Sequence, residues 1–196
     1  MKIFSKWRNS NSKVREWVES FVVALVLALF IRTFIIQAFK IPTGSMRVTL
    51  IEGDRILVNK LAYGPKIPLT KWRLPGYSHP QRGDVIVFTY PEDRKRDFIK
   101  RLIAVGGETL EIRQGRILID GQPVDDLVIR NIYYYNRGAY GVEGEKITVP
   151  ADSYFVLGDN SGSSKDSRYW GFVPKELLIG KAQVIYWPLN RIRFIK

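Results

Sequence analysis

Ser45 has the side chain and the setting of a catalytic nucleophile. It lies in residues 40–46, where Pro42 and Gly44 predict a flexible, exposed segment. This segment follows the one stretch of the sequence that is long and apolar enough to cross a bilayer. A serine hydroxyl is a poor nucleophile until a base removes its proton. The chemistry therefore depends on which base the sequence can supply.

The composition removes most of the usual bases and nucleophiles. The sequence has no cysteine and one histidine, which excludes thiol catalysis, disulfides and cysteine-based zinc sites. His79 precedes Pro80 in a predicted loop, where we expect it to be solvated, so a Ser–His pair is the minor alternative. Arginine stays protonated. A lysine can act as a base only where burial or neighbouring cations lower its pKa.

Lys100 lies in a segment whose pattern of apolar residues indicates such burial. Residues 98–105 have the composition of a strand, in which alternate side chains point to opposite faces. Both predicted faces are apolar: one carries Lys100 with Phe98, Leu102 and Ala104, and the other carries Arg101 with Ile99, Ile103 and Val105. A desolvated lysine there would suit Ser–Lys catalysis. An edge strand whose cations block aggregation fits the periodicity equally well.

Residues 17–36 are predicted to form a membrane-spanning element upstream of Ser45. Twenty residues at about 1.5 Å each span about 30 Å, the thickness of the hydrocarbon core. No small-x-small cleavage site follows, which argues against a cleavable signal peptide, and the run is apolar on all faces, which argues against a buried core helix. Upstream basic residues orient the N-terminus to the cytoplasm. We therefore expect a cytoplasmic segment over 1–16 and an anchor over 17–38.

The rest of the sequence has the period-two pattern of β-strands. We expect strands at 55–60, 84–90, 98–105, 109–113, 116–120, 154–157 and 181–187. Gln114-Gly115 and Asp120-Gly121 predict tight turns, the first closing a hairpin. One helical turn is expected at 174–178. The fold class is therefore all-β after the anchor, with coiled antiparallel sheets that form a sandwich or a partly open barrel.

Four ordered blocks of this sequence resemble the bacterial type I signal peptidases. The blocks are residues 41–46 with Thr49-Leu50, residues 53–64, residues 82–88 followed by Lys100-Arg101 and 106–108, and residues 158–171. The resemblance extends over the chain from residue 14 onward. It implies a signal-peptidase-like fold and a Ser–Lys dyad protease that cleaves signal peptides.

The resemblance also implies roles for individual residues. Ser45 would be the nucleophile and Lys100 the general base. The Ser45 backbone N–H and the Thr43 hydroxyl would form the oxyanion hole, and each donor is typically worth about 3 kcal/mol. Ser164 matches the serine that hydrogen-bonds the lysine amine and orients it.

Further positions match the family's substrate pockets and its charged residues. The matches to pocket positions are Ile41, Pro42, Leu50, Phe98 and Ile99. The peptide is expected to bind as an added strand, with the pockets selecting Ala-x-Ala-like ends. Four charged residues are interpreted as a structural ion-pair network: Arg101, Asp159, Asp166 and Arg168. Asn160 is interpreted as a tight-turn residue that follows the predicted strand at 154–157.

The resemblance divides the chain and also has exceptions. We expect a catalytic β-domain over 39–108 and 151–196, with an accessory β-region over 109–150. Within that region, residues 122–150 have no secure match and partner binding is the weaker alternative. Val48 stands where the family usually has proline, so a less rigid backbone is expected after the nucleophile. Glu108, Gly162 and Ser163 are the other departures.

The net charge of +12, from 31 basic and 19 acidic residues, suits either anionic lipid or nucleic acid as a partner. The export topology argues against nucleic acid. We expect instead docking on the outer leaflet, helped by Trp72, Tyr77, Trp170 and Trp187.

The expected protein is a single-pass protease of the bacterial plasma membrane, with its catalytic domain on the extracytoplasmic face. Its partners would be signal-peptide-bearing preproteins, the phospholipid bilayer and a nearby secretion translocon, and we expect no metal or cofactor. An anchored β-barrel binding module without chemistry is the alternative from another functional class.

Overall fold

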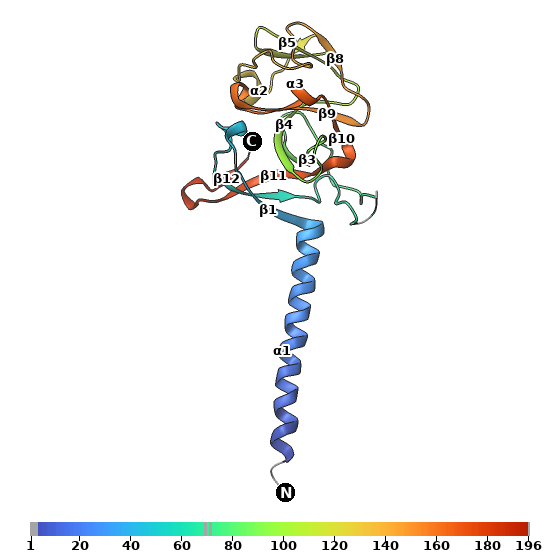
Figure 1. Ribbon diagram of the computed structural model, residues 1–196, viewed down its shortest axis with the longest axis vertical. Coiled ribbons are helices and arrows are strands. Elements are labelled where there is room, and N and C mark those ends of the chain that lie inside the picture. The colour runs from blue at the N-terminus through green and yellow to red at the C-terminus, as the bar shows by residue number, and fades with distance from the viewer. Residues whose placement is uncertain (1–3, 69, 71, 196) are drawn as a thin grey trace.

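One long helix projects from a body built of β-strands (Figure 1). The computed structural model describes residues 4–68, 70 and 72–195. The helix, α1 (Phe4–Phe30), is the N-terminal element, and the remaining helices of the described residues are turns of three to five residues. This arrangement confirms the predicted fold class, with an all-β body and one N-terminal apolar helix.

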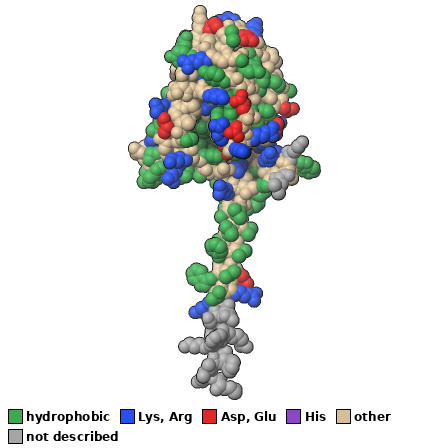
Figure 2. Space-filling model, viewed as in Figure 1, with side chains coloured by type: hydrophobic (Ala, Val, Ile, Leu, Met, Phe, Trp, Pro, Cys, Tyr) green, Lys and Arg blue, Asp and Glu red, His purple; other side chains and the backbone are tan. Residues whose placement is uncertain are grey.

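The end of α1 differs from the predicted anchor. Residues 13–35 are long and apolar enough to cross a membrane, and Figure 2 shows their hydrophobic side chains on the helix surface. A π-helical turn, Ile31–Ile35, ends the helix, and Ile36–Lys40 then forms strand β1. The predicted anchor runs to residue 38, whereas the helical segment ends at residue 35. Residues 36–38 pair with β2 instead, so backbone pairing decides their structure.

The large sheet is antiparallel and positions the residues of interest. Its strand order is β1-β2-β11-β3-β4-β9-β10, and β12 pairs with β11. The strands are β1 (Ile36–Lys40), β2 (Arg55–Asn59), β3 (Val85–Thr89), β4 (Asp97–Val105), β9 (Ser153–Leu157), β10 (Val173–Pro174), β11 (Leu178–Trp187) and β12 (Arg193–Phe194). Strands β1, β10 and β12 were not predicted; β10 and β12 span two residues each.

A second sheet of four strands has the order β7-β6-β5-β8. Its strands are β5 (Thr109–Arg113), β6 (Arg116–Ile119), β7 (Gln122–Pro123) and β8 (Lys146–Thr148). Both turns that join β5, β6 and β7 have two residues with positive φ, at Gln114-Gly115 and Asp120-Gly121. Positive φ at both positions is typical of type I′ hairpins, so the two predicted tight turns are confirmed.

Two short helices belong to loops near the sheets. In α2 (Leu127–Arg130) the Asp126 carboxylate accepts hydrogen bonds from the first N–H groups, and in α3 (Ser167–Trp170) the Asp166 carboxylate does so. The helical turn predicted at 174–178 is a 3₁₀ turn, Lys175–Leu177. Short polar side chains satisfy the N–H groups that a helix start leaves unpaired.

Strand β4 departs from simple alternation near its end. Its pairing with β9 shifts register between Leu102 and Ala104. As a result, Ala104 packs with Ile103 in the core cluster under the second sheet, and Val105 joins Leu102 in another cluster. The prediction that Ala104 shares a face with Lys100 is therefore wrong, because a bulge reverses the side-chain alternation.

Candidate active site

Ser45 and Lys100 are in contact, although three strands separate β1 from β4 in the order of the large sheet. Ser45 is in the 3₁₀ turn Gly44–Met46 that follows β1, and Lys100 is in the middle of β4, paired with Ile86 of β3. Lys100 Nζ donates to Ser45 Oγ at 2.6 Å and to the Ile99 carbonyl at 3.0 Å. The hydroxyl and the amine therefore lie within proton-transfer distance.

Burial changes the acid–base chemistry of Lys100. The side chain is 3% exposed. Desolvation lowers the pKa of Lys100 to about 8, aided by the Arg168 charge and opposed by the Asp166 and Asp159 charges. Removing an ammonium from water disfavours its charged form, which is the cause of this shift. A substantial fraction of the amine is therefore neutral near pH 8.

Two buried ion pairs support this region, and they involve the four charged residues singled out in the sequence. Arg101 binds Asp159 through two hydrogen bonds of 2.8 and 2.7 Å. Arg168 binds Asp166 through two bonds of 2.8 Å. Bidentate ion pairs of this kind fix the relative orientation of the two side chains as well as the distance between them. Each pair is neutral overall, so neither leaves an unpaired anion beside the Lys100 amine.

The carboxylates also connect the ion pairs to the segment around Ser45. Asp159 accepts a short hydrogen bond from the Thr49 hydroxyl, in the loop just after Ser45. Asp166 accepts from the Gly158 N–H at 3.0 Å and begins α3. The pairs thus tie residues 158–168 and the segment after Ser45 to strand β4.

Asn160 directly contacts the turn that carries Ser45, which sequence reasoning missed. Its side-chain Nδ2 donates to the Gly44 carbonyl at 2.9 Å, and its backbone N–H donates to the Ser45 carbonyl at 3.1 Å. Asn160 lies in a bend, as predicted, and these contacts are additional to its place in the turn. The sequence holds no sign of this contact, because a backbone carbonyl 116 positions away leaves no pattern in it.

Ser164 does not make the hydrogen bond that was expected of it. Its Oγ is buried and has no hydrogen-bond partner among the described residues. It lies beside Gly158, where an added Cβ would come within 2.2 Å of Ser164 Oγ and 2.5 Å of the Ser45 carbonyl oxygen. The serine thus belongs to the site, while Lys100 Nζ bonds Ser45 and Ile99 instead.

A mostly apolar groove of about 500 Å³ lies over Ser45 and Lys100. The residues that line it are Pro42, Thr43, Ser45, Arg96, Asp97, Phe98, Ile99, Lys100, Ser163 and Lys165. Three of the five predicted substrate positions are in this set. The other two, Ile41 and Leu50, are 3% and 0% exposed and pack in the core cluster with Met46. The expectation that they line the pocket is not met, because apolar burial places them beneath it.

Aromatic side chains adjoin Phe98 in the groove wall. The Phe98 ring stacks on Tyr90, with centroids 4.3 Å apart, and meets the Trp170 ring edge-on at 5.7 Å. Trp170 was expected at the membrane surface, but it is half-buried and packs in this cluster. Trp72, Tyr77 and Trp187 are exposed, as membrane docking would require.

Other sequence predictions can be placed as well. His79 is exposed in the loop before β3 and does not line the groove, so it offers Ser45 no alternative base there. Within the described part of the chain, His, Asp and Glu side chains form no group of three or more that could hold a metal ion.

Val48 adopts a backbone that proline cannot adopt. Its φ is +91° and its side chain is 78% exposed. A β-branched residue at positive φ is strained, and proline is fixed near −65°. The loop after Ser45 therefore follows a path that excludes the proline common in the resembled family.

Comparison with known proteins gives a consistent result over most of the chain. The family described as "Signal peptidase, peptidase S26" matches residues 14–187. Signal peptidase I from Leptolyngbya laminosa is 40% identical over 190 residues, covering 93% of this chain and 84% of the relative. Signal peptidase I from Pseudomonas aeruginosa is 33% identical over 214 residues, covering 92% and 75%. A crystal structure of a signal peptidase I from Enterococcus faecalis is 34% identical, with a TM-score of 0.43, covering 53% of this chain and 97% of that one.

Proposed function

This chain belongs to the signal peptidase family, peptidase S26, and from that membership we propose that it removes signal peptides from exported preproteins with a Ser45–Lys100 dyad. The observation that carries the proposal is the 2.6 Å contact between Ser45 Oγ and a buried Lys100 amine. A neutral amine at this distance can take the hydroxyl proton as the oxygen attacks a peptide carbonyl.

The proposed reaction follows the usual course of acyl transfer. Ser45 Oγ attacks the scissile carbonyl carbon and Lys100 Nζ takes the proton. The Ser45 N–H and the Thr43 hydroxyl stabilise the oxyanion. The Lys100 ammonium then protonates the departing amine of the mature protein, which leaves the signal peptide as an ester on Ser45. Water, deprotonated by Lys100, hydrolyses this ester and restores the enzyme.

We propose that the substrate binds in the groove as an extended strand. Main-chain hydrogen bonds would hold it, and Pro42, Phe98 and Ile99 would contact the side chains just before the cleavage point. The Tyr90 and Trp170 rings pack against Phe98 and hold it in place. A packed aromatic wall leaves little room for side-chain branches, which fits selection of small-x-small ends.

Helix α1 would anchor the enzyme in the plasma membrane with its N-terminus in the cytoplasm. The supporting observation is the exposed apolar surface over residues 13–35, preceded by basic residues. The groove would then lie on the extracytoplasmic face, near the translocon, where a signal peptide leaves the bilayer.

The test is incubation of the detergent-solubilised full chain with a preprotein that has an Ala-x-Ala site. Mass determination should show one cut directly after that site. Ser45→Ala and Lys100→Met should each abolish the cut, whereas Lys95→Met, at an exposed lysine just before β4, should leave it unchanged. Near-normal turnover by Lys100→Met would refute the dyad, and an inert wild-type chain would favour a binding module.

A further inference from the structure

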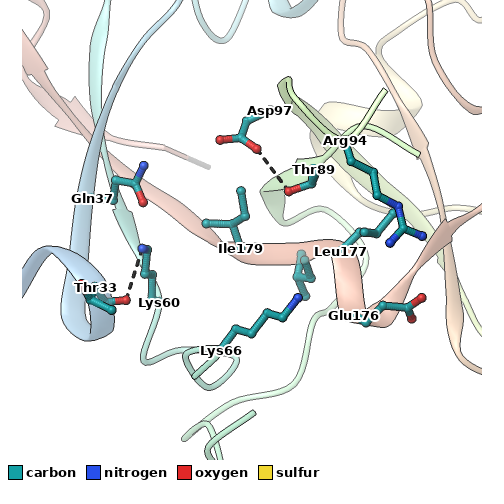
Figure 3. Close-up of a pocket in the computed structure, with 11 residues that line it drawn as sticks. Thr33, Gln37, Lys60, Lys66, Thr89, Arg94, Asp97, Glu176, Leu177 and Ile179 are labelled. Atoms are coloured by element: carbon teal, nitrogen blue, oxygen red, sulfur yellow. Dashed lines mark hydrogen bonds between the residues drawn. The ribbon is translucent and has the colours of Figure 1, made fainter. Parts of the chain in front are cut away.

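A second pocket lies where α1 meets the β-body, apart from the groove over Ser45. Its volume is about 420 Å³, within the range of ligand sites. Figure 3 shows Thr33, Gln37 and Lys60 on one side and Arg94, Leu177 and Glu176 on the other, with Lys66 below them. Thr33 belongs to the last turn of the apolar segment, so the pocket opens at the height where lipid head groups would begin.

Cations outnumber anions in this pocket. Three basic side chains, Lys60, Lys66 and Arg94, face two acidic ones, Asp97 and Glu176. Within the described residues, none of the three cations is within ion-pair distance of a carboxylate. Lys60 Nζ donates to the Arg32 and Thr33 carbonyls at 3.0 and 3.2 Å, which holds its charge at the end of the helical segment.

An apolar groove lies on the opposite face of the edge strand β1, beside the end of the helix. It has a volume of about 500 Å³ and shares Gln37 with the pocket. The residues that line it are Ala28, Ile31, Arg32, Ile36, Gln37, Ala38 and Leu57. A polar, cationic pocket and an apolar groove therefore lie on the two faces of the sheet edge that β1 forms.

We propose that the pocket and the groove together bind one molecule of phosphatidylglycerol. The inference rests on the proposed membrane anchor, because only a spanning α1 places the site in the head-group layer. The phosphate would bind Lys60, Lys66 and Arg94, since charge-assisted bonds to phosphate are strong. One acyl chain would pass round the edge strand β1 and lie in the groove beside Ile31 and Leu57.

The two carboxylates select among phospholipids. Asp97 and Glu176 can accept hydrogen bonds from the two hydroxyls of a glycerol head group, whereas a serine head group would bring a third carboxylate against them. The lining has a net charge of +1, from three cations and two anions, which matches a head group of charge −1. Zwitterionic lipids leave that charge unbalanced.

Exposed aromatic side chains nearby also fit a position of the pocket in the lipid head-group layer. Trp72 and Tyr77 are exposed on the loop that also carries Lys66. Aromatic rings of this kind favour the interface between lipid and water. The pocket also shares Asp97 with the groove over Ser45, which makes an upstream part of the substrate peptide the competing occupant.

The test measures lipid binding to the full chain in a neutral detergent by native mass spectrometry. Phosphatidylglycerol should bind at least tenfold more tightly than phosphatidylcholine or phosphatidylethanolamine with the same acyl chains. The double variant Lys66→Gln/Arg94→Gln should lose at least tenfold in this affinity. The control Arg116→Gln/Lys146→Gln removes the same charge from exposed positions in the second sheet and should bind as the wild type does.

Several results would overturn the proposal. An equal loss of phosphatidylglycerol affinity in both double variants would indicate that net charge alone drives binding. Phosphatidylethanolamine binding as tightly as phosphatidylglycerol would refute selection of an anionic head group. Displacement by equimolar inorganic phosphate would show a phosphate site without lipid. Weaker cleavage of a short soluble peptide by Lys66→Gln/Arg94→Gln, with lipid binding unchanged, would assign the pocket to substrate.

The experiments distinguish failure of the proposed function from failure of this lipid site. A wild-type chain that binds phosphatidylglycerol but cuts no preprotein refutes only the protease assignment. Alkaline extraction of the full chain from membranes tests the anchor independently of both measurements.

Discussion

Lys100 Nζ lies 2.6 Å from Ser45 Oγ, although the two residues are 55 positions apart in the sequence. Strand β4 carries the lysine into the core, and the turn after β1 brings the serine over it. The contact therefore depends on how the sheet closes around these two elements.

The rate of cleavage should depend on the protonation of Lys100. Because only the neutral amine can accept the Ser45 proton, kcat/KM should rise as the pH passes through about 8, the lowered pKa of Lys100. The measurement is kcat/KM for a peptide substrate from pH 5 to 10. A maximum near pH 6 would contradict the assignment.

Lys100→Met should make the fold more stable while abolishing cleavage. The folded-state pKa of Lys100, about 8, lies below its ordinary value of 10.5, so the unfolded chain binds the extra proton between these values. Stability therefore rises with pH across this window. Below about pH 8 the folded state bears the cost of a buried ammonium, about 3 kcal/mol as an upper value.

The check is thermal or denaturant unfolding of the wild type and Lys100→Met, monitored by tryptophan fluorescence. The stability gain of Lys100→Met should be largest at pH 7 and should shrink above pH 10. A variant less stable than the wild type at pH 7 would show that the bond to Ser45 outweighs the desolvation of the amine.

Asn160→Ala should slow the chemical step with little effect on KM. The Gly44–Ser45 peptide is planar, so the bond from Asn160 Nδ2 to the Gly44 carbonyl also fixes the direction of the Ser45 N–H. Misdirecting a proposed oxyanion donor should lower kcat by about tenfold or more. Steady-state kinetics tests this, with the exposed Asn190→Ala as the matched control. An unchanged kcat would remove Asn160 from the positioning role.

Gly158→Ala should abolish most cleavage. The added methyl group would lie 2.2 Å from Ser164 Oγ and 2.5 Å from the Ser45 carbonyl oxygen, so the turn that carries Ser45 must shift. A displacement of about 1 Å at a catalytic group can cost about a hundredfold in rate. Gly162→Ala, four residues on in the same loop, meets Tyr135 only at 3.5 Å and should keep its activity. Similar rates for the two variants would disprove this account.

Val48→Gly should stabilise the protein slightly. Glycine adopts a φ of +91° without the clash that valine suffers, and the relief should be about 1 kcal/mol after the greater freedom of the unfolded chain is deducted. Val48→Pro should instead destabilise the fold, because proline cannot reach this φ. Unfolding in urea measures both variants. Val142→Gly, at an exposed valine without positive φ, should not stabilise.

Local patterns in the sequence were sufficient for several elements. The apolar run predicted the long helix, and alternation predicted β2 to β6, β9 and most of β11 within a few residues. The dipeptides Gln114-Gly115 and Asp120-Gly121 predicted their turns, because positive φ depends mainly on the residues that adopt it. The ordered blocks around Ser45 and Lys100 identified the family.

Other features were decided by the tertiary structure alone. Residues 36–38 become strand because β2 offers pairing partners, and the bulge in β4 moves Ala104 away from the face of Lys100. Periodicity left Lys100 equally compatible with an exposed edge strand. Its lowered pKa comes from burial among groups far away in the sequence.

The hydrogen bonds of Asn160 and the missing partner of Ser164 are likewise invisible in the sequence. The same holds for the meeting of Lys60, Lys66 and Arg94 at the end of α1. The physical reason is common to all of them. Residue type and spacing determine local conformation and chemical capacity, whereas distances, desolvation and pairing between remote segments exist only once the chain has folded.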